Sequence, residues 1–157
     1  MALANDTTAP DFELPNQFGE HIRLHDFRGV KPVALVFFSL AFSPVCTSEL
    51  RTLRDNIALF DTHGVELLGI SVDSKATLGA FAESQEYAFT LLADFWPHGD
   101  VAKQYGVFIE DKGFAHRATF VIDIDGVIRA SFIIQLGVPR PLDAYTAAFA
   151  ELHAIRA

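Results

Sequence analysis

Cysteine is almost absent from this sequence of 157 residues, because Cys46 is the only one. A single cysteine cannot form a disulfide within the chain, so the fold must depend on its hydrophobic core. Basic residues are also scarce: 12 Lys and Arg accompany 20 Asp and Glu, which gives a net charge of −8. This charge argues against a nucleic-acid partner, since binding to phosphate backbones depends on clustered Lys and Arg.

The sequence lacks a secretory signal and a membrane-spanning run. Residues 1–6 contain no basic region followed by an apolar core, which a signal peptide would need. The longest apolar stretch, residues 33–42, is interrupted by Ser39 and is too short to cross a bilayer. We therefore expect a cytoplasmic protein with no membrane association.

Several common motifs are missing as well. We find no glycine-rich phosphate loop, no Gly-x-Ser-x-Gly elbow and no Cys-x-x-Cys pair. Among the six histidines only His21 and His25 have ligand-like spacing, and zinc needs three or four convergent ligands. We expect no metal site and no bound cofactor. A Cys–His hydrolase pair of Cys46 and His116 is an alternative, but no third residue is evident to orient the imidazole.

What the chain does have is apolar residues, which make up half of it and include fifteen Phe. This content is enough for the core of one domain over residues 1–157. The patterns predict a hairpin over residues 12–24, strands over 33–38, 65–72, 90–92, 118–122 and 127–133, and helices following residues 43, 73, 97 and 140. This order predicts an α/β fold whose central mixed sheet is flanked by helices.

The stretch around the cysteine carries the strongest local pattern. Residues 33–38 form a continuous apolar run that is typical of a central strand buried on both faces. Ser43 and Pro44 suit the N-cap and the first position of a helix, and the Ser43 hydroxyl is expected to accept a backbone N–H. Cys46 then lies in the first turn, where the positive end of the helix favours a reactive thiolate.

The same stretch resembles the signature of peroxiredoxins, in which Pro-x-x-x-Thr/Ser-x-x-Cys is followed three residues later by Glu. Here the positions are Ser39, Ser43, Cys46 and Glu49, so serine replaces the proline of the pattern. Further landmarks of that family follow in the expected order: Ala9-Pro10-Asp11-Phe12, Val36-Phe37-Phe38, Asp94-Phe95-Trp96-Pro97-His98-Gly99, Tyr105-Gly106-Val107 and Arg117-Ala118-Thr119-Phe120-Val121-Ile122-Asp123. The type that the chain most resembles is the one-cysteine alkyl hydroperoxide reductase E of actinobacteria.

The resemblance implies a thioredoxin-like fold and a set of site residues. Cys46 would be the peroxidatic residue and Arg117, just before a predicted strand, the cation beside it. Ser43 would assist the sulfur and Glu49 would orient the arginine. A peroxide-binding set is also implied, and it consists of Ser39, Phe42, Val45 and Trp96. We interpret Phe42 and Trp96 as core or interface aromatics.

The implied activity is thiol-dependent reduction of hydrogen peroxide and organic hydroperoxides through a sulfenic acid on Cys46. Since the chain has no resolving cysteine, an external thiol must regenerate the enzyme. The resemblance suggests a low-molecular-weight thiol such as mycothiol, with a mycoredoxin-like protein, and a homodimer or higher homo-oligomer. The alternative is a redox-sensing or chaperone-like protein of the same fold whose cysteine turns over poorly.

Overall fold

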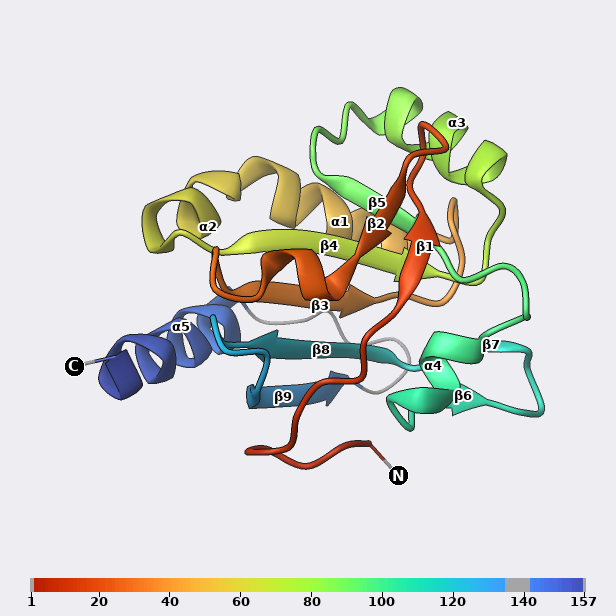
Figure 1. Cartoon of the computed structure of the whole chain (residues 1–157). Coiled ribbons are helices and arrows are strands. Elements are labelled where there is room, and N and C mark those ends of the chain that lie inside the picture. Colours follow the sequence, from red (N-terminus) through yellow and green to blue (C-terminus); the bar gives the residue numbers. More distant parts are fainter. Residues whose placement is uncertain (1, 135–141, 157) are drawn as a thin grey trace.

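A mixed five-stranded sheet forms the centre of the computed structural model, which describes residues 2–134 and 142–156 (Figure 1). Its strands run in the order β5-β4-β3-β8-β9. They are β3 (Val33–Phe37), β4 (Glu66–Ser71), β5 (Thr90–Ala93), β8 (Arg117–Ile122) and β9 (Ile128–Ile134). The other elements are β1 (Glu13–Pro15), β2 (His21–Arg23), the 3-10 helix η1 (Leu24–Phe27), α1 (Pro44–Asp55), α2 (Ile57–His63), α3 (Lys75–Gln85), α4 (Asp100–Gln104), β6 (Phe108–Ile109), β7 (Phe114–Ala115) and α5 (Leu142–Arg156).

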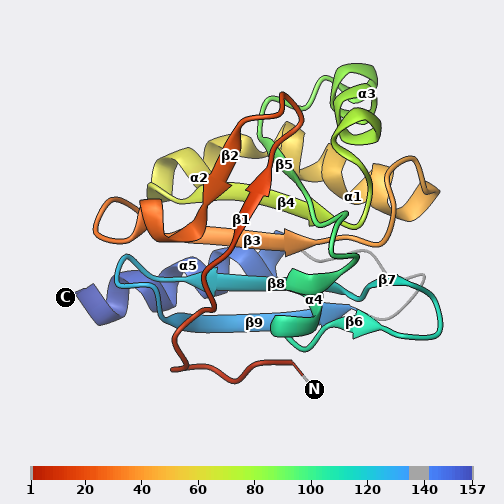
Figure 2. The same ribbon diagram turned by 45° about the vertical axis from the view of Figure 1, so that its right-hand side comes forward.

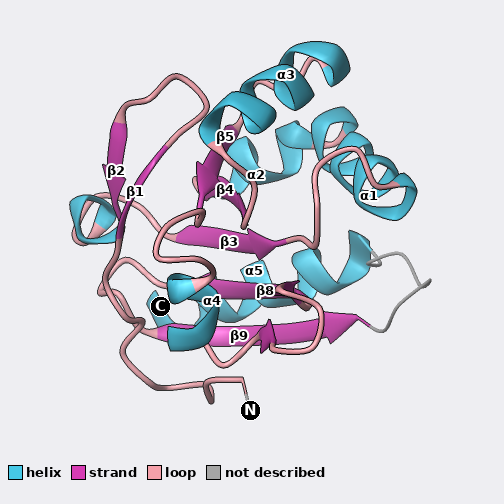
Figure 3. Cartoon of the chain, turned by 90° about the vertical axis from the view of Figure 1, so that its right-hand side faces the viewer, coloured by secondary structure: helices cyan, strands magenta, loops and turns pink. Residues whose placement is uncertain are grey.

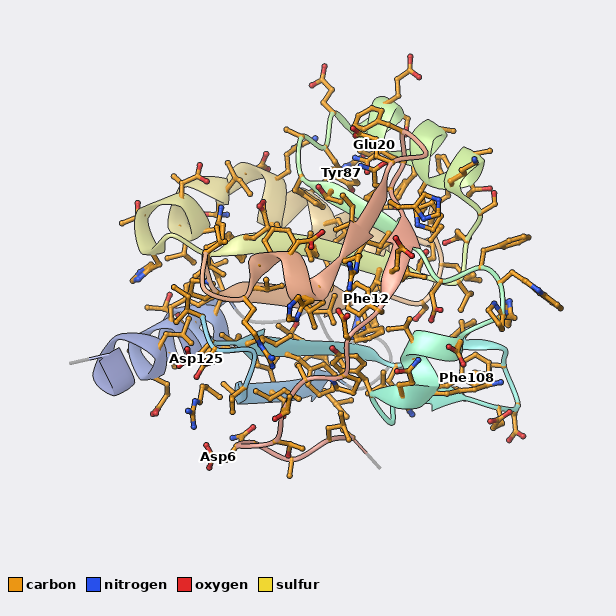
Figure 4. All side chains as sticks on the ribbon, in the orientation of Figure 1. Asp6, Phe12, Glu20, Tyr87, Phe108 and Asp125 are labelled. Carbon is orange, nitrogen blue, oxygen red and sulfur yellow. The ribbon has the colours of Figure 1, made fainter. Side chains whose placement is uncertain are left out.

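The sheet is covered on both faces. Helices α1, α2, α3 and α5 lie on one face, and the β1–β2 hairpin and α4 lie on the other (Figure 3). Along β3 the side chains alternate between the two layers. Val36 packs with the helices, whereas Leu35 and Phe37 pack on the hairpin side in the cluster that contains Phe12. Phe12 is labelled in Figure 4. All five residues of β3 are buried, which explains why its sequence is a continuous apolar run.

The predicted strands and the mixed sheet are confirmed, with boundaries that differ by one or two residues. The helix expected after Ser43 is two helices, because Asn56 leaves the helical backbone angles (φ −120°, ψ 25°) between α1 and α2. Gly64 ends α2 in the left-handed conformation, which is common for glycine at this position. The short β6–β7 pair was not predicted. Pro141, the predicted start of the last helix, lies outside the described residues.

The topology gathers several chain segments at one edge of the sheet. Strands β3, β4 and β5 are parallel, so the loops that follow them leave from the same edge (Figure 2). Strand β8 is antiparallel to β3 and therefore begins there, with Arg117 as its first residue. In open α/β sheets this carboxyl edge is the usual place for a site. In the described part of the chain, no helix is long and apolar enough to cross a membrane.

Candidate active site

Cys46 lies at the third position of α1, the helix that follows β3 after the connection of residues 38–43. The backbone of Ser43 is extended (φ −67°, ψ 144°), Pro44 opens the helix, and Thr47 N–H donates to the Ser43 carbonyl (2.9 Å). The N–H groups of Val45 and Cys46 belong to the first turn, where no helical carbonyl is available to accept them. Only 1% of Cys46 is exposed. The cysteine is therefore a buried thiol, and it lies in the first turn of a helix, which is the position that the sequence predicted.

The Ser43 hydroxyl makes a different bond from the expected one. It donates to the carbonyl of Leu40 (2.8 Å) and does not cap α1. The reason is the turn that precedes the helix, in which the Ser43 N–H also points at the Leu40 carbonyl (3.4 Å). The turn places this carbonyl within hydrogen-bonding distance of the hydroxyl. Ser43 thus orders the loop of residues 39–43, hereafter the 39–43 loop.

Arg117 and Glu49 form a buried ion pair. Nη1 of Arg117 donates to Oε1 of Glu49 (3.1 Å), and both side chains are almost inaccessible to solvent. Glu49 lies one helical turn after Cys46, whereas Arg117 comes from the start of β8. The predicted pairing is thus present, and neither residue is the solvated surface charge that its residue type would suggest. Buried charges of this kind depend on each other, because each would be costly to bury alone.

Asp73, at the end of β4, holds the 39–43 loop in place. Its Oδ2 accepts the N–H of Ala41 (2.8 Å) and the hydroxyl of Ser71 (2.7 Å). Phe42, next to Ala41, has a left-handed backbone (φ 68°), which is rare for a large side chain, and its ring packs on Phe81 of α3 (4.9 Å between centroids). The loop before Cys46 is therefore held by contacts with the β4–α3 segment.

Tyr87 holds the helix on the other side of Cys46. Its hydroxyl donates to the carbonyl of Thr47 (3.1 Å), and its ring contacts Phe81 and stacks on Phe89. Burial raises the pKa of Tyr87 to about 12, although the nearby Arg51 and Arg54 act in the opposite direction. The hydroxyl therefore stays protonated across the neutral pH range and can donate its hydrogen bond to the Thr47 carbonyl.

An open cleft of about 450 Å³ adjoins Arg117. It is lined by Ser39, Ile109, Lys112, His116, Arg117, Ile133 and Ile134. The Ser39 hydroxyl lies 3.5 Å from the Ala115 carbonyl, which makes this a long and weak hydrogen bond. The serine that replaces the proline of the signature thus lines the cleft at the start of the 39–43 loop.

The two candidate aromatics do not belong to the core. Phe42 is 51% exposed and Trp96 is 82% exposed, so the core interpretation of these residues is wrong. The reason is that both lie in loops beyond the strand ends, after β3 and β5, where no layer covers them. Leu40 and Phe95 are exposed in the same two loops. Among the described residues, no ring contact joins Trp96 to the 39–43 loop.

Comparisons with known proteins agree with this geometry. The model of the AhpC/TSA family matches residues 6–131, which is most of the chain. The chain belongs to the AhpC/TSA family of peroxiredoxins. It is 44% identical over 147 residues to alkyl hydroperoxide reductase E of Mycobacterium tuberculosis, covering 94% of this chain and 96% of the relative. It is 41% identical over 131 residues to peroxiredoxin Bcp of Escherichia coli, covering 79% and 81%.

Solved peroxiredoxin structures have the same fold. Peroxidoxin BcpB of Mycobacterium tuberculosis superposes with a TM-score of 0.84 at 32% identity, over 99% of both chains. The reduced 2-Cys peroxiredoxin of Plasmodium vivax gives a TM-score of 0.87 at 27% identity, over 98% of this chain and 99% of the other. The predicted thioredoxin-like fold is confirmed. This peroxiredoxin is a thiol peroxidase of the one-cysteine type.

Sequence reasoning missed Asp73 and Tyr87 as neighbours of the cysteine. Asp73 was interpreted only as a start signal for the following helix, and Tyr87 had no assigned place. A weak signal existed for each. Asp73 directly follows a buried strand whose end lies at the carboxyl edge, and Tyr87 brings a polar group to an otherwise apolar stretch.

Proposed function

We propose that Cys46 is the peroxidatic residue of this enzyme. The observation that carries the proposal is that the only cysteine in the chain lies in the first turn of α1, close to the buried Arg117–Glu49 pair that joins this helix to β8. Negative charge on the sulfur would be favoured by the N–H groups of the helix start. No other residue of the sequence could supply a thiolate.

The proposed reaction begins with attack of the Cys46 thiolate on the terminal oxygen of a hydroperoxide. An S–O bond forms, the O–O bond breaks, and the sulfur becomes a sulfenic acid. The leaving hydroxide or alkoxide takes a proton. Arg117, the N–H groups of Val45 and Cys46, and the Ser43 hydroxyl after it turns from Leu40 would stabilise the charge that spreads over the two oxygens. Glu49 would orient the guanidinium.

An external thiol completes the proposed cycle. It attacks the sulfenic sulfur, releases water and forms a mixed disulfide, which a second thiol then reduces. The absence of a second cysteine in the sequence supports this route. Mycothiol, with a mycoredoxin-like protein, is the reductant that we propose from the resemblance to the actinobacterial enzymes. We place the reaction in the cytoplasm, where such thiols are kept reduced.

Organic hydroperoxides are proposed as substrates together with hydrogen peroxide. The support is the 450 Å³ cleft beside Arg117, to which Ile109, Ile133 and Ile134 give an apolar lining. It has room for an alkyl group that hydrogen peroxide does not carry. Ser39 borders this cleft, and Val45 would contribute its backbone N–H.

A homodimer is proposed from the exposed apolar side chains at the carboxyl edge of the sheet. Leu40, Phe42, Phe95 and Trp96 come from the loops after β3 and β5 and are exposed in the single chain. Large apolar residues that are exposed together mark contact surfaces on soluble proteins, and these four all follow strands that end at this edge. Phe42 and Trp96 would then meet a second copy near the site.

The test is the number of turnovers. The purified protein is mixed with a tenfold excess of hydrogen peroxide or tert-butyl hydroperoxide, with and without a monothiol, and peroxide loss is followed. Continued consumption with the thiol, and a single equivalent without it, supports the proposal. One equivalent in both cases would overturn the catalytic cycle and favour a redox sensor.

A further inference from the structure

An open groove of about 490 Å³ lies between the tip of the β1–β2 hairpin and α3. Gln17 and Phe18 line it from the hairpin, and Gly79, Glu83 and Glu86 line it from α3 and its C-terminal end. Figure 3 shows the tip of the hairpin approaching α3. The groove shares no lining residue with the 450 Å³ cleft of the candidate active site. It is therefore a second hollow in the surface, for which the peroxidase reaction has no use.

The hairpin tip presents an aromatic ring on a fixed backbone. The side-chain amide of Gln17 donates to the carbonyl of Phe89 (3.1 Å) and accepts the N–H of Leu91 (2.9 Å). Oδ1 of Asn16 accepts the N–H of Phe18 (2.9 Å). Phe18 itself is 78% exposed. Because its backbone is already held, a partner could cover this ring at little cost in conformational entropy.

A glycine allows α3 to come close to this tip. A Cβ atom at Gly79 would lie only 3.3 Å from the carbonyl oxygen of Gln17, which is tighter than ordinary van der Waals contact. The helix can therefore pack against the hairpin with its backbone at this point. The close approach brings the two carboxylates of α3 and its end, Glu83 and Glu86, into the same groove as Phe18.

Both carboxylates are exposed and available to a partner. Within residues 2–134 and 142–156, neither Glu83 nor Glu86 makes a side-chain hydrogen bond or an ion pair. Arg54 is near enough to interact electrostatically with Glu86, but its hydrogen bonds go to the Asp55 carboxylate and the Gln85 carbonyl. The groove therefore offers negative charge beside an exposed aromatic ring.

The backbone at Glu86 favours a different residue. Glu86 ends α3 in the left-handed conformation (φ 57°, ψ 42°). Glycine is the usual residue at this position of a helix, because it adopts a positive φ without strain. The chain thus carries a carboxylate where the fold alone would favour glycine, and strain of this kind is typical of positions that serve a function.

We propose that this groove is a docking site for an arginine of a partner protein, flanked in that partner by apolar residues. A guanidinium is planar and always charged, so it stacks on an aromatic face such as that of Phe18 and pairs with carboxylates such as those of Glu83 and Glu86. The net charge of −8 attracts a basic segment from a distance. The proposal goes beyond the peroxidase function and does not rest on the role of Cys46.

The probe is the peptide Ala-Leu-Arg-Leu-Ala with blocked ends. Its control carries citrulline in place of arginine, which keeps the shape and removes the charge. Each peptide is titrated into the full-length, ¹⁵N-labelled protein, and the amide resonances are followed by NMR. We expect shifts concentrated at residues 16–20 and 79–87, with a dissociation constant of about 1 mM that rises with salt. Shifts that are absent or spread over the surface, or equal binding of the citrulline peptide, would overturn the proposal.

Two variants of the groove and one matched control identify the contacts. Phe18→Ser removes the ring, and Glu83→Gln with Glu86→Gln removes both charges. The control, Glu110→Gln with Asp111→Asn, removes two exposed carboxylates between β6 and β7 and changes the net charge equally. We expect the dissociation constant to rise about fivefold in each groove variant and to stay unchanged in the control. An equal rise in the control would mean that only net charge acts, and this would overturn the proposal.

Glu86→Gly separates binding from stability. Glycine relieves the left-handed backbone, so the melting temperature should rise, while the arginine peptide should bind more weakly because one carboxylate is lost. A variant that is more stable and binds equally well would show that the carboxylate has no part in docking and would overturn the proposal. None of these measurements uses peroxide, so a failure of the proposed peroxidase function would leave their outcome unaffected.

Discussion

Replacing the buried Arg117–Glu49 pair separates its part in stability from its part in catalysis. Removing Glu49 alone, as Glu49→Leu, deprives a buried guanidinium of the carboxylate that lies 3.1 Å away. Removing one partner of a buried pair costs about 3–5 kcal/mol. For a chain of this size each kcal/mol corresponds to roughly 2–4 °C in melting temperature. We therefore expect a fall of about 6–20 °C, within reach of calorimetry.

The double variant Glu49→Leu with Arg117→Met should recover most of this loss. Two apolar side chains of similar size need no partner, and such replacements are often neutral or stabilising. Catalysis should not recover, because the cation that is proposed to stabilise the peroxide oxygens is gone. By comparison with the loss of one transition-state donor, oxidation of Cys46 should be about 10²-fold slower.

The assay combines urea unfolding, which gives the free energy of each variant, with stopped-flow oxidation by hydrogen peroxide. A double variant that is stable but slow agrees with the reasoning. A double variant as unstable as Glu49→Leu would show that the pair is not the source of the cost. A double variant that oxidises at the parental rate would place Arg117 outside the site.

Three further predictions concern other parts of the molecule. Ser39→Pro should raise the rate of Cys46 oxidation and lower its further oxidation to sulfinic acid, because the proline ring would exclude water. The substitution removes only the weak hydrogen bond from Ser39 to the Ala115 carbonyl. Unchanged rates and sulfinate yield in an equally stable protein would contradict this prediction. Burial raises the pKa of Asp94 to about 6, above its unfolded value of 3.8. Its protonated form therefore favours the fold, and this contribution is fully present below pH 3.8 and lost as the pH rises through about 6. The urea midpoint of the parent minus that of Asp94→Asn should therefore fall as the pH rises from 3.8 to about 6. A difference that stays constant over this range would refute the prediction. Trp96→Glu should dissociate the proposed homodimer in sedimentation experiments, and an unchanged dimer would move the interface elsewhere.

The strand, the helix start and the site of the cysteine were predictable from local sequence. The apolar run that precedes Ser43 and Pro44 determines where β3 ends and α1 begins, and it therefore places Cys46 in the first turn. The resemblance predicted Arg117 beside the cysteine, and the antiparallel pairing of β8 with β3 explains why its first residue lies at the carboxyl edge. These features depend on neighbours in the chain or on the order of the strands.

Features that depend on contacts between distant residues were not predictable. Asp73 and Tyr87 reach the Cys46 turn from positions 32 and 40 residues away from their partners. The Ser43 hydroxyl could bond to the helix or to its own loop, and only the folded turn at Leu40 decides between them. Trp96 is a large apolar residue of the kind that often lies in a core, yet in the loop after β5 it is exposed to solvent.

The fate of the peroxide oxygen tests the central claim most directly. One equivalent of hydrogen peroxide is added to the reduced protein without thiol, in the presence of dimedone, which traps sulfenic acids. Peptide mass spectrometry then locates the modification. The account predicts one dimedone adduct per chain, on Cys46, with all of the peroxide consumed, and neither an adduct nor rapid consumption in Cys46→Ser. Equal peroxide consumption by Cys46→Ser, or oxidation at Met1 or Trp96 in place of Cys46, would contradict it.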